Sequence, residues 1–159
     1  APAGAGALGL TTGEGYRLRW KRKAIRINNT GAYGDTLIDG IYRGVGDVQL
    51  IATFKEWNVT VGKMIWPWGA GSPPVFDGTL GTIGVLDSGK ALPIVLTPGA
   101  GTPAAANGPS NGVLTCGLAI LAAENDIEWL NGPVETDIPV VFDLLLYDDS
   151  GTKRFFAWS

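Results

Sequence analysis

The chain of 159 residues contains no histidine and only one cysteine, Cys116. Without histidine, catalytic pairs in which an imidazole activates a serine or a cysteine cannot form within the chain. A single cysteine excludes an internal disulfide bond. Together the two shortages exclude the common zinc sites, which use three or four Cys or His ligands. An enzyme built on this chain would have to work with carboxylates or lysine alone, and we expect no catalytic residue, metal site or cofactor.

Basic residues are outnumbered, with 12 Lys and Arg against 15 Asp and Glu and a sequence pI near 4.8. This balance disfavours a nucleic-acid binder that neutralises phosphates, since such domains are usually basic. The charge is unevenly spread: residues 1–79 hold nine basic and six acidic side chains, and residues 80–159 hold three and nine. Such asymmetry favours self-association.

Long apolar runs are also missing. The longest one, residues 113–123, has eleven residues and includes Thr115 and Gly117. It is too short to span a bilayer, so we expect no membrane partner.

Glycine and proline, in contrast, are plentiful, with 24 and 10 residues. They separate segments in which apolar residues recur every second position, a pattern typical of antiparallel sheets. The sequence therefore predicts one all-β domain over residues 1–159. We expect an antiparallel β-sandwich or barrel with one short flanking α-helix and long loops.

Three segments are predicted strands. In residues 48–57, Val48, Leu50, Ala52 and Phe54 share one face and should enter the core, with turns upstream at Asp39-Gly40 and at residues 44–46. Residues 138–147 are apolar on both faces, which indicates cover on both sides, the second by another subunit. Residues 113–121 are a third strand. Residues 148–151 should close a hairpin into residues 153–158.

One helix is predicted over residues 60–66, ended by Pro67. Residues 66–74 and 97–112 are rich in Gly and Pro and poor in charge, and we expect these loops to contact other subunits.

Two charged segments allow a chemical and a structural interpretation. A strand at residues 124–129 would align Glu124, Asp126 and Glu128 as a cation site or glycosidase-like pair, but a solvated strand face is favoured. The basic run at residues 17–26 could bind a polyanion by charge and stacking. We favour a basic strand face that meets an acidic surface on a neighbouring subunit.

The order of these segments resembles the bacteriophage tail tube proteins. The resemblance is carried by residues 38–44, by residues 48–57 followed by the helix at 60–66, by residues 90–97, and by residues 119–129, 136–147 and 149–158. It covers about residues 33–158 and is a pattern of strands and turns. Residues 1–16 have no counterpart and are interpreted as a flexible or interface-forming N-terminal arm.

The resemblance implies a virion protein assembled in the host cytoplasm. Six copies would close into a ring, and rings would stack into a tube whose acidic lumen conducts genomic DNA during ejection. Partners would be further copies, other tail proteins such as a sheath, a terminator and a baseplate, and DNA in transit. The alternatives are a capsid decoration or head-tail joining protein and, third, a carboxylate-based hydrolase.

Two sets of residues follow as candidates for these roles. The lumen should be lined by acidic side chains of a strand with a polar face, for which the candidates are Asp35, Asp39 and Asp47. If residues 35–47 form one strand, Gly40, Gly44 and Gly46 predict bulges in it. The candidates for subunit interfaces are Trp66, Trp68, Val141, Leu145, Tyr147, Arg17 and Arg19.

Overall fold

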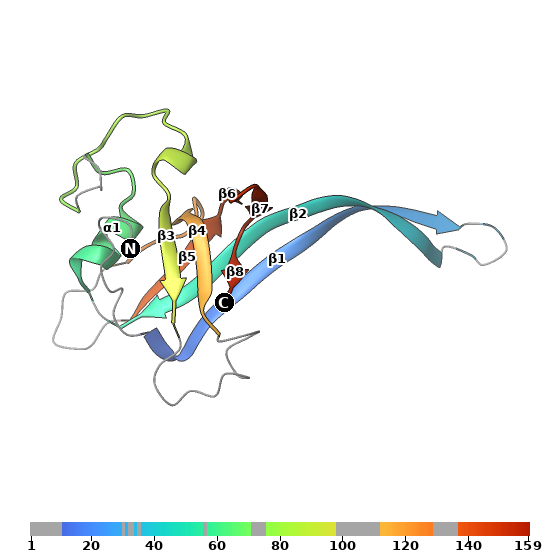
Figure 1. The fold of residues 1–159 in the computed structure, drawn as a ribbon, viewed down its shortest axis with the longest axis horizontal. Helices are drawn as coiled ribbons and strands as arrows, with labels where there is room; N and C mark the ends of the chain where they lie inside the picture. The colour runs from blue at the N-terminus through green and yellow to red at the C-terminus, as the bar shows by residue number, and fades with distance from the viewer. Residues whose placement is uncertain are drawn as a thin grey trace.

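A computed structural model describes residues 11–29, 31, 34, 36–55, 57–70, 76–97, 112–128 and 137–159. Strands dominate these residues (Figure 1). In chain order the elements are β1 Thr11–Asn29, β2 Thr36–Phe54, α1 Val59–Ile65, the short 3-10 helix η1 Asp87–Gly89, β3 Leu92–Leu96, β4 Leu114–Leu121, β5 Ile138–Leu144, β6 Tyr147–Asp149, β7 Thr152–Arg154 and β8 Ala157–Trp158.

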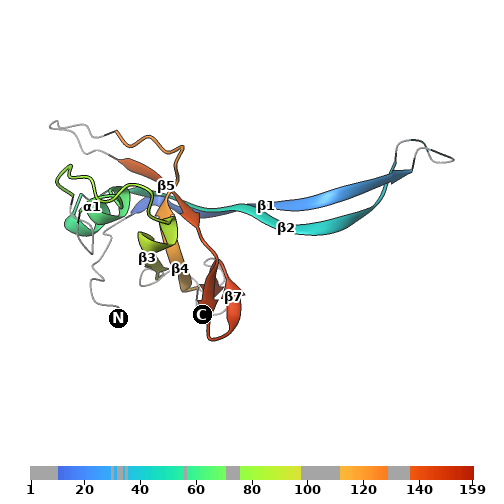
Figure 2. The same ribbon diagram turned by 90° about the horizontal axis from the view of Figure 1, so that it is seen from above.

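The main sheet is antiparallel, with the strand order β1-β2-β5-β4-β3 and with β8 beside β4. It curls into a half-barrel, and β6 and β7 form a separate small hairpin. This confirms the predicted all-β fold with one short helix. The long β1-β2 hairpin extends beyond the body of the molecule on one side, and α1 lies at the other end (Figures 1 and 2).

The core lies on one face of this sheet. Val48, Leu50, Ala52 and Phe54 of β2 are all buried, as their alternation predicts. β5 contributes Ile138, Val140, Phe142 and Leu144 with the same period of two, and the Phe54 and Phe142 rings lie 6.4 Å apart. α1 adds Val61, Met64 and Ile65 to the same cluster. The predicted core face of β2 is therefore confirmed, and one of the two apolar faces of β5 lies in the same core.

The helix forms one residue earlier than predicted because Asn58 caps it. The Val61 N–H donates to Asn58 Oδ1 at 2.9 Å, which satisfies one of the amides that the first turn leaves without an intrahelical partner. The helix ends at Ile65, Trp66 is its C-cap and Pro67 follows.

β4 carries a glycine where a side chain would not fit. A Cβ on Gly117 would lie 2.5 Å from the ring of Tyr147, so the glycine lets that ring lie against the strand. β5 ends at Leu144, before the predicted end of this strand at residue 147, and Tyr147 opens the β6-β7 hairpin. The turn of this hairpin lies within residues 148–151 as predicted, and Ser150 and Gly151 have positive φ angles there. The Lys153 ammonium bonds the Asp148 carboxylate at 2.8 Å, and this bond lowers the pKa of Asp148.

Three local predictions are wrong. Asp39-Gly40 and residues 44–46 are not turns before a strand: they lie inside β2, where shifts of the β1-β2 register absorb the extra residues as bulges. Residues 124–128 form no strand, because Asn125 closes a turn onto the Ala122 carbonyl and its side chain accepts from the Val141 N–H. Residues 153–158 are split between β7 and β8.

Candidate assembly interface

The basic run forms the middle of β1, which pairs with β2. On the N-terminal side of Gln49 in β2, these two strands extend away from the rest of the sheet. β5 pairs with β2 only from Gln49 to Phe54. Among the described residues, the remainder of β2 has β1 as its sole strand partner. We call residues 20–29 and 36–47 the projecting hairpin.

Three register shifts lie along the projecting hairpin, between Arg19 and Lys21, Lys23 and Ala24, and Ile27 and Asn28. Gly44 at φ 107° and Asp47 at φ 49° provide the left-handed backbone that such irregularities use. Aspartate, the residue type at position 47, is one of the few besides glycine that adopt this conformation readily. The glycines that looked like turn signals therefore bend and twist a continuous strand.

Large apolar side chains are exposed along the projecting hairpin. Tyr42 is 62% exposed and Ile38 is 61% exposed. A soluble monomer rarely leaves so many apolar side chains on one slender element. The set comprises Trp20, Ile25, Ile27, Leu37, Ile38, Ile41, Tyr42 and Val45.

The same element is basic. Residues 20–47 hold five basic and three acidic side chains, whereas residues 48–159 hold five basic and eleven acidic ones. The Lys23 side chain lies against Gly46, where an added Cβ would meet its Cε. The hairpin thus combines apolar surface with a positive charge opposite to that of the body.

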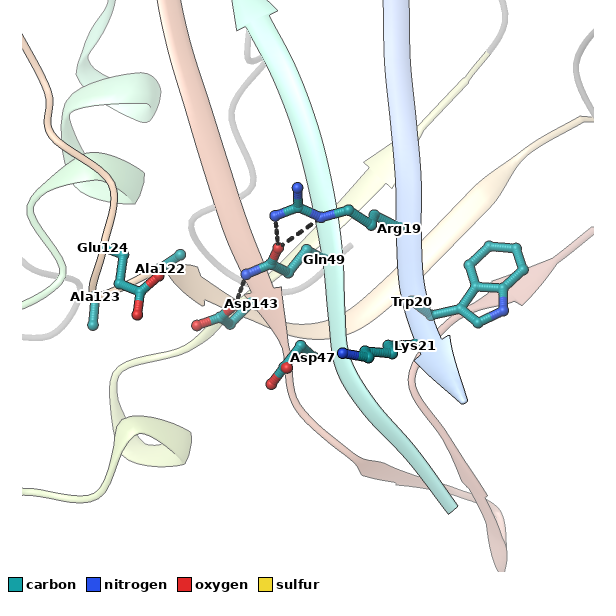
Figure 3. Close-up of a pocket in the computed structure, with 9 residues that line it drawn as sticks. All are labelled: Arg19, Trp20, Lys21, Asp47, Gln49, Ala122, Ala123, Glu124 and Asp143. Atoms are coloured by element: carbon teal, nitrogen blue, oxygen red, sulfur yellow. Dashed lines mark hydrogen bonds between the residues drawn. The ribbon is translucent and has the colours of Figure 1, made fainter. Parts of the chain in front are cut away.

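A polar ladder crosses the sheet at the base of the projecting hairpin (Figure 3). The Arg19 guanidinium donates to Gln49 Oε1, and Gln49 Nε2 donates to Asp143 Oδ1 at 2.8 Å. The three residues are direct partners across β1, β2 and β5. They border an open pocket of about 550 Å³ that is also lined by Lys21, Asp47 and Glu124. Its charges have both signs, and the ladder already satisfies several of its polar groups.

A second apolar surface surrounds α1 and the segment at residues 76–89. Trp57, Trp66, Trp68 and Phe76 form an aromatic cluster, with the Trp57 and Phe76 rings 5.1 Å apart. The segment is held to the end of α1: Trp66 Nε1 donates to the Thr79 carbonyl at 2.9 Å, and the Gly81 N–H donates to the Trp68 carbonyl at 2.7 Å.

Beyond these bonds the segment presents apolar side chains to solvent. Ile83 is 91% exposed and Leu86 is 78% exposed, and Leu80 and Val59 are similarly open. We call the exposed set Trp57, Val59, Trp68, Phe76, Leu80, Ile83, Val85 and Leu86 the end patch. In the described part of the chain, only Val95 and Leu146 are exposed large apolar residues outside the projecting hairpin and the end patch.

The predicted lumen residues lie on the projecting hairpin or outside the description. Asp39 and Asp47 are exposed on β2. The Gly40 N–H donates to the Asp39 carboxylate at 2.7 Å. Asp35 lies outside the described residues. The structure therefore brings Asp39 and Asp47 into the neighbourhood of Lys21, Lys23 and Arg26 rather than into an acidic surface.

The predicted interface residues fall into three places. Trp66 and Trp68 lie in the aromatic cluster of the end patch. Arg17 and Arg19 align with Ile51 and Gln49 on the sheet face opposite the core, and Val141 lies on that face of β5. Leu145 follows β5, where its N–H donates to the Leu118 carbonyl, and Tyr147 packs against Gly117. Of the two predicted contact loops, residues 98–111 and 71–75 lie outside the described residues.

Sequence reasoning missed the far half of the projecting hairpin and the exposed segment at residues 76–89. The available signal for the second was the occurrence of Leu80, Ile83, Val85 and Leu86 in a stretch rich in glycine. Apolar side chains in a segment with the composition of a loop have no regular face to bury, so they indicate a contact surface.

Reactive groups are scarce in the described part of the chain. No group of three or more His, Cys, Asp or Glu side chains there is placed to hold a metal ion. Cys116 is fully buried, and burial raises the pKa of its thiol to about 12, which keeps it protonated and unreactive. The described helices include none with the length and apolar character needed to cross a membrane.

Searches for related proteins add no assignment. Neither the protein-family models, nor the curated proteins, nor the solved structures contain a match to this chain.

Proposed function

We propose that this chain is a structural subunit that assembles with copies of itself into rings, and that the rings stack into a hollow tail tube through which DNA passes. The observation that carries the proposal is the projecting hairpin, with its eight exposed large apolar side chains. The resemblance of the order of segments along the sequence to bacteriophage tail tube proteins supports the same function.

The physical argument starts from the isolation of the projecting hairpin. Two strands without further cover are marginally stable in water. Here they carry apolar side chains, and each strand is paired only with the other within the residues that the structure describes. A long edge strand with apolar side chains is a template for association with another chain. A second copy that covers the projecting hairpin would both remove apolar surface from water and stabilise the hairpin.

The open sheet supports closure into a ring. In the part of the chain that the structure describes, the half-barrel has β1 and β3 as its two outer strands. A neighbour at each edge would continue the packing around a closed ring, as cyclic homo-oligomers do. Pro93, the second residue of β3, has no N–H to donate, which disfavours the addition of a further strand at that edge.

The acidic lumen is a separate part of the proposal. The role of Asp39 and Asp47 in lining it stays a prediction, and the surplus of basic side chains around them weighs against it. The acidic side chains of residues 124–149 are an alternative source of negative surface, because this stretch contains no Lys or Arg.

The test is assembly of the purified chain alone. Sedimentation velocity over a range of protein and salt concentrations should show discrete ring-sized species, and negative-stain micrographs should show hollow rods of uniform width. A capsid decoration or joining protein would stay small until its own partner was added. A species that is monomeric at every concentration and salt, with no rods after prolonged incubation, would contradict the proposal.

A further inference from the structure

The exposed apolar surface of this molecule is divided between two elements that lie at opposite ends. The projecting hairpin extends to one end of the long axis, and α1 with the end patch lies toward the other (Figures 1 and 2). Almost all exposed large apolar side chains in the described residues belong to one or the other. The hairpin points away from the body, so a single copy does not cover its own end patch.

We propose that the projecting hairpin of one copy packs on the end patch of the next copy. This inference rests on the proposed function, since it names the contact that joins the subunits. The contact is heterologous: a different surface is used on each side, so every copy donates a hairpin and receives one.

Two observations favour this pairing over hairpin-to-hairpin contacts. An isologous contact between two hairpins would place like charges together, because residues 20–47 carry five basic and three acidic side chains. It would also leave Ile83 and Leu86 in water. A head-to-tail contact covers both apolar surfaces with the same interaction.

Charge acts in the same direction. The excess of acidic side chains in residues 48–159 attracts a basic hairpin from solution and accelerates encounter, an effect that weakens as salt is added. The end patch itself contains little charge, since Lys63, Asp77, Asp87 and Lys90 near it balance. Apolar side chains of the hairpin can therefore dock there without burying an unpaired charge that belongs to the patch.

The receiving surface is also shaped before binding. The hydrogen bonds from Trp66 to Thr79 and from Gly81 to Trp68 hold the segment at residues 76–89 on α1. Because Gly62 has no side chain, Phe76 can pack closely against the helix: a Cβ added to Gly62 would lie 3.1 Å from Phe76 Cβ. A surface that is already ordered loses less conformational entropy when a partner binds.

The experiment mixes two variants that each lack one side of the contact. The hairpin variant carries Ile41→Glu and Tyr42→Glu, and the patch variant carries Ile83→Glu and Leu86→Glu. All four side chains are exposed, so both variants should fold, which circular dichroism and urea unfolding check. The matched control is Leu146→Glu, an exposed apolar position outside both surfaces.

Each variant alone should lose assembly, with the subunit dissociation constant raised at least about 10-fold, whereas the Leu146→Glu control should assemble like the original chain. An equimolar mixture should give one-to-one heterodimers and nothing larger in sedimentation velocity, because one intact hairpin and one intact patch remain. A patch variant that assembles normally, or a mixture that forms no heterodimer, would overturn the inference while leaving the tube proposal intact. Failure of the unmodified chain to assemble would instead overturn both.

A crosslinking measurement covers the case in which a variant does not fold. A photoreactive phenylalanine analogue placed at position 42 of the assembled chain should crosslink to peptides from residues 57–90 of another copy. Crosslinks to residues 36–47 of another copy, or to any other segment, would overturn the inference.

Discussion

The two halves of β2 belong to one strand and one hairpin, yet they differ in the burial of their side chains and in the strands beside them. From Val48 to Phe54, side chains alternate between buried and half-buried, and Leu50 is only 1% exposed. From Thr36 to Val45 nearly all side chains are exposed. Among the strands that the structure describes, the first half has neighbours on both sides and the second has only β1. Strand formation thus requires a partner for the backbone, while burial of side chains requires a layer packed on top.

This contrast indicates which half of β2 stabilises the folded monomer. The body half of β2 belongs to the core cluster with β5 and α1, and its stability is a property of the monomer. The projecting half has no such layer among the described residues, so its apolar side chains gain little until another molecule covers them.

The strongest contrast is between Phe142 in the core and Tyr42 on the projecting hairpin. Phe142→Ala should lower the free energy of unfolding by about 3–5 kcal/mol, because it removes a fully buried ring. Tyr42→Ala should change it by less than about 0.5 kcal/mol, since that side chain is exposed. Urea unfolding of dilute protein measures both. A loss of similar size for the two variants would show that the hairpin is packed within the monomer.

Gly117 tests how closely the body is packed. Gly117→Ala should destabilise the protein by about 1–3 kcal/mol, because the new methyl group would displace the Tyr147 ring. Gly89→Ala is the matched control, since a Cβ there meets only Val85 at an ordinary 3.5 Å. Adding Tyr147→Ala should make the effect of Gly117→Ala much smaller. Additive losses in the double variant would mean that the ring does not lie against this glycine.

The buried thiol of Cys116 predicts a pH dependence in the body alone. Its pKa is about 12 in the folded chain against an ordinary value of 9.0. The folded state therefore disfavours ionisation: the stability is complete below pH 9 and is lost as the pH rises toward 12. From pH 9 to 10 this group should lower the free energy of unfolding by about 1 kcal/mol.

The tyrosines titrate in the same range, so the cysteine contribution is measured as the difference between the original chain and Cys116→Ala. Both are unfolded in urea at pH 8, 9 and 10, and the gap between them should shrink with increasing pH. A constant gap would contradict the assigned pKa.

The smallest effect on stability is expected at Asp39 and Asp47. Replacing both with Lys should change the unfolding free energy by at most about 1 kcal/mol, because both are exposed, and should leave assembly in place. If they line the channel, assembled tubes of the variant should retain double-stranded DNA at low salt that the original tubes release. Asp47→Asn, which keeps a residue type tolerant of φ 49°, separates charge from backbone strain. Unchanged DNA retention would place these residues away from the lumen.

Much of the body could be predicted from local patterns. Val48, Leu50, Ala52 and Phe54 share a face because alternation along a strand is set by backbone geometry. The bounds of α1 follow from the residues at its two ends. Asn58 caps the first turn, and Pro67 cannot continue a helix. The candidate assembly surfaces were predicted only in part, through Trp66, Trp68 and the basic run.

Residue types and short-range periodicity are enough to specify the class of fold, the core face of β2 and the absence of histidine chemistry. Gly44 and Asp47 bend β2 and do not end it, and this depends on the tertiary structure. A bulge and a turn use the same residue types, and they differ in whether a partner strand distant in the sequence continues alongside. The pairing of the basic run with residues 36–47, and the resulting separation of two apolar surfaces to opposite ends, are likewise non-local. They arise because backbone hydrogen bonds can be satisfied by β1 and β2 alone while the side chains stay uncovered.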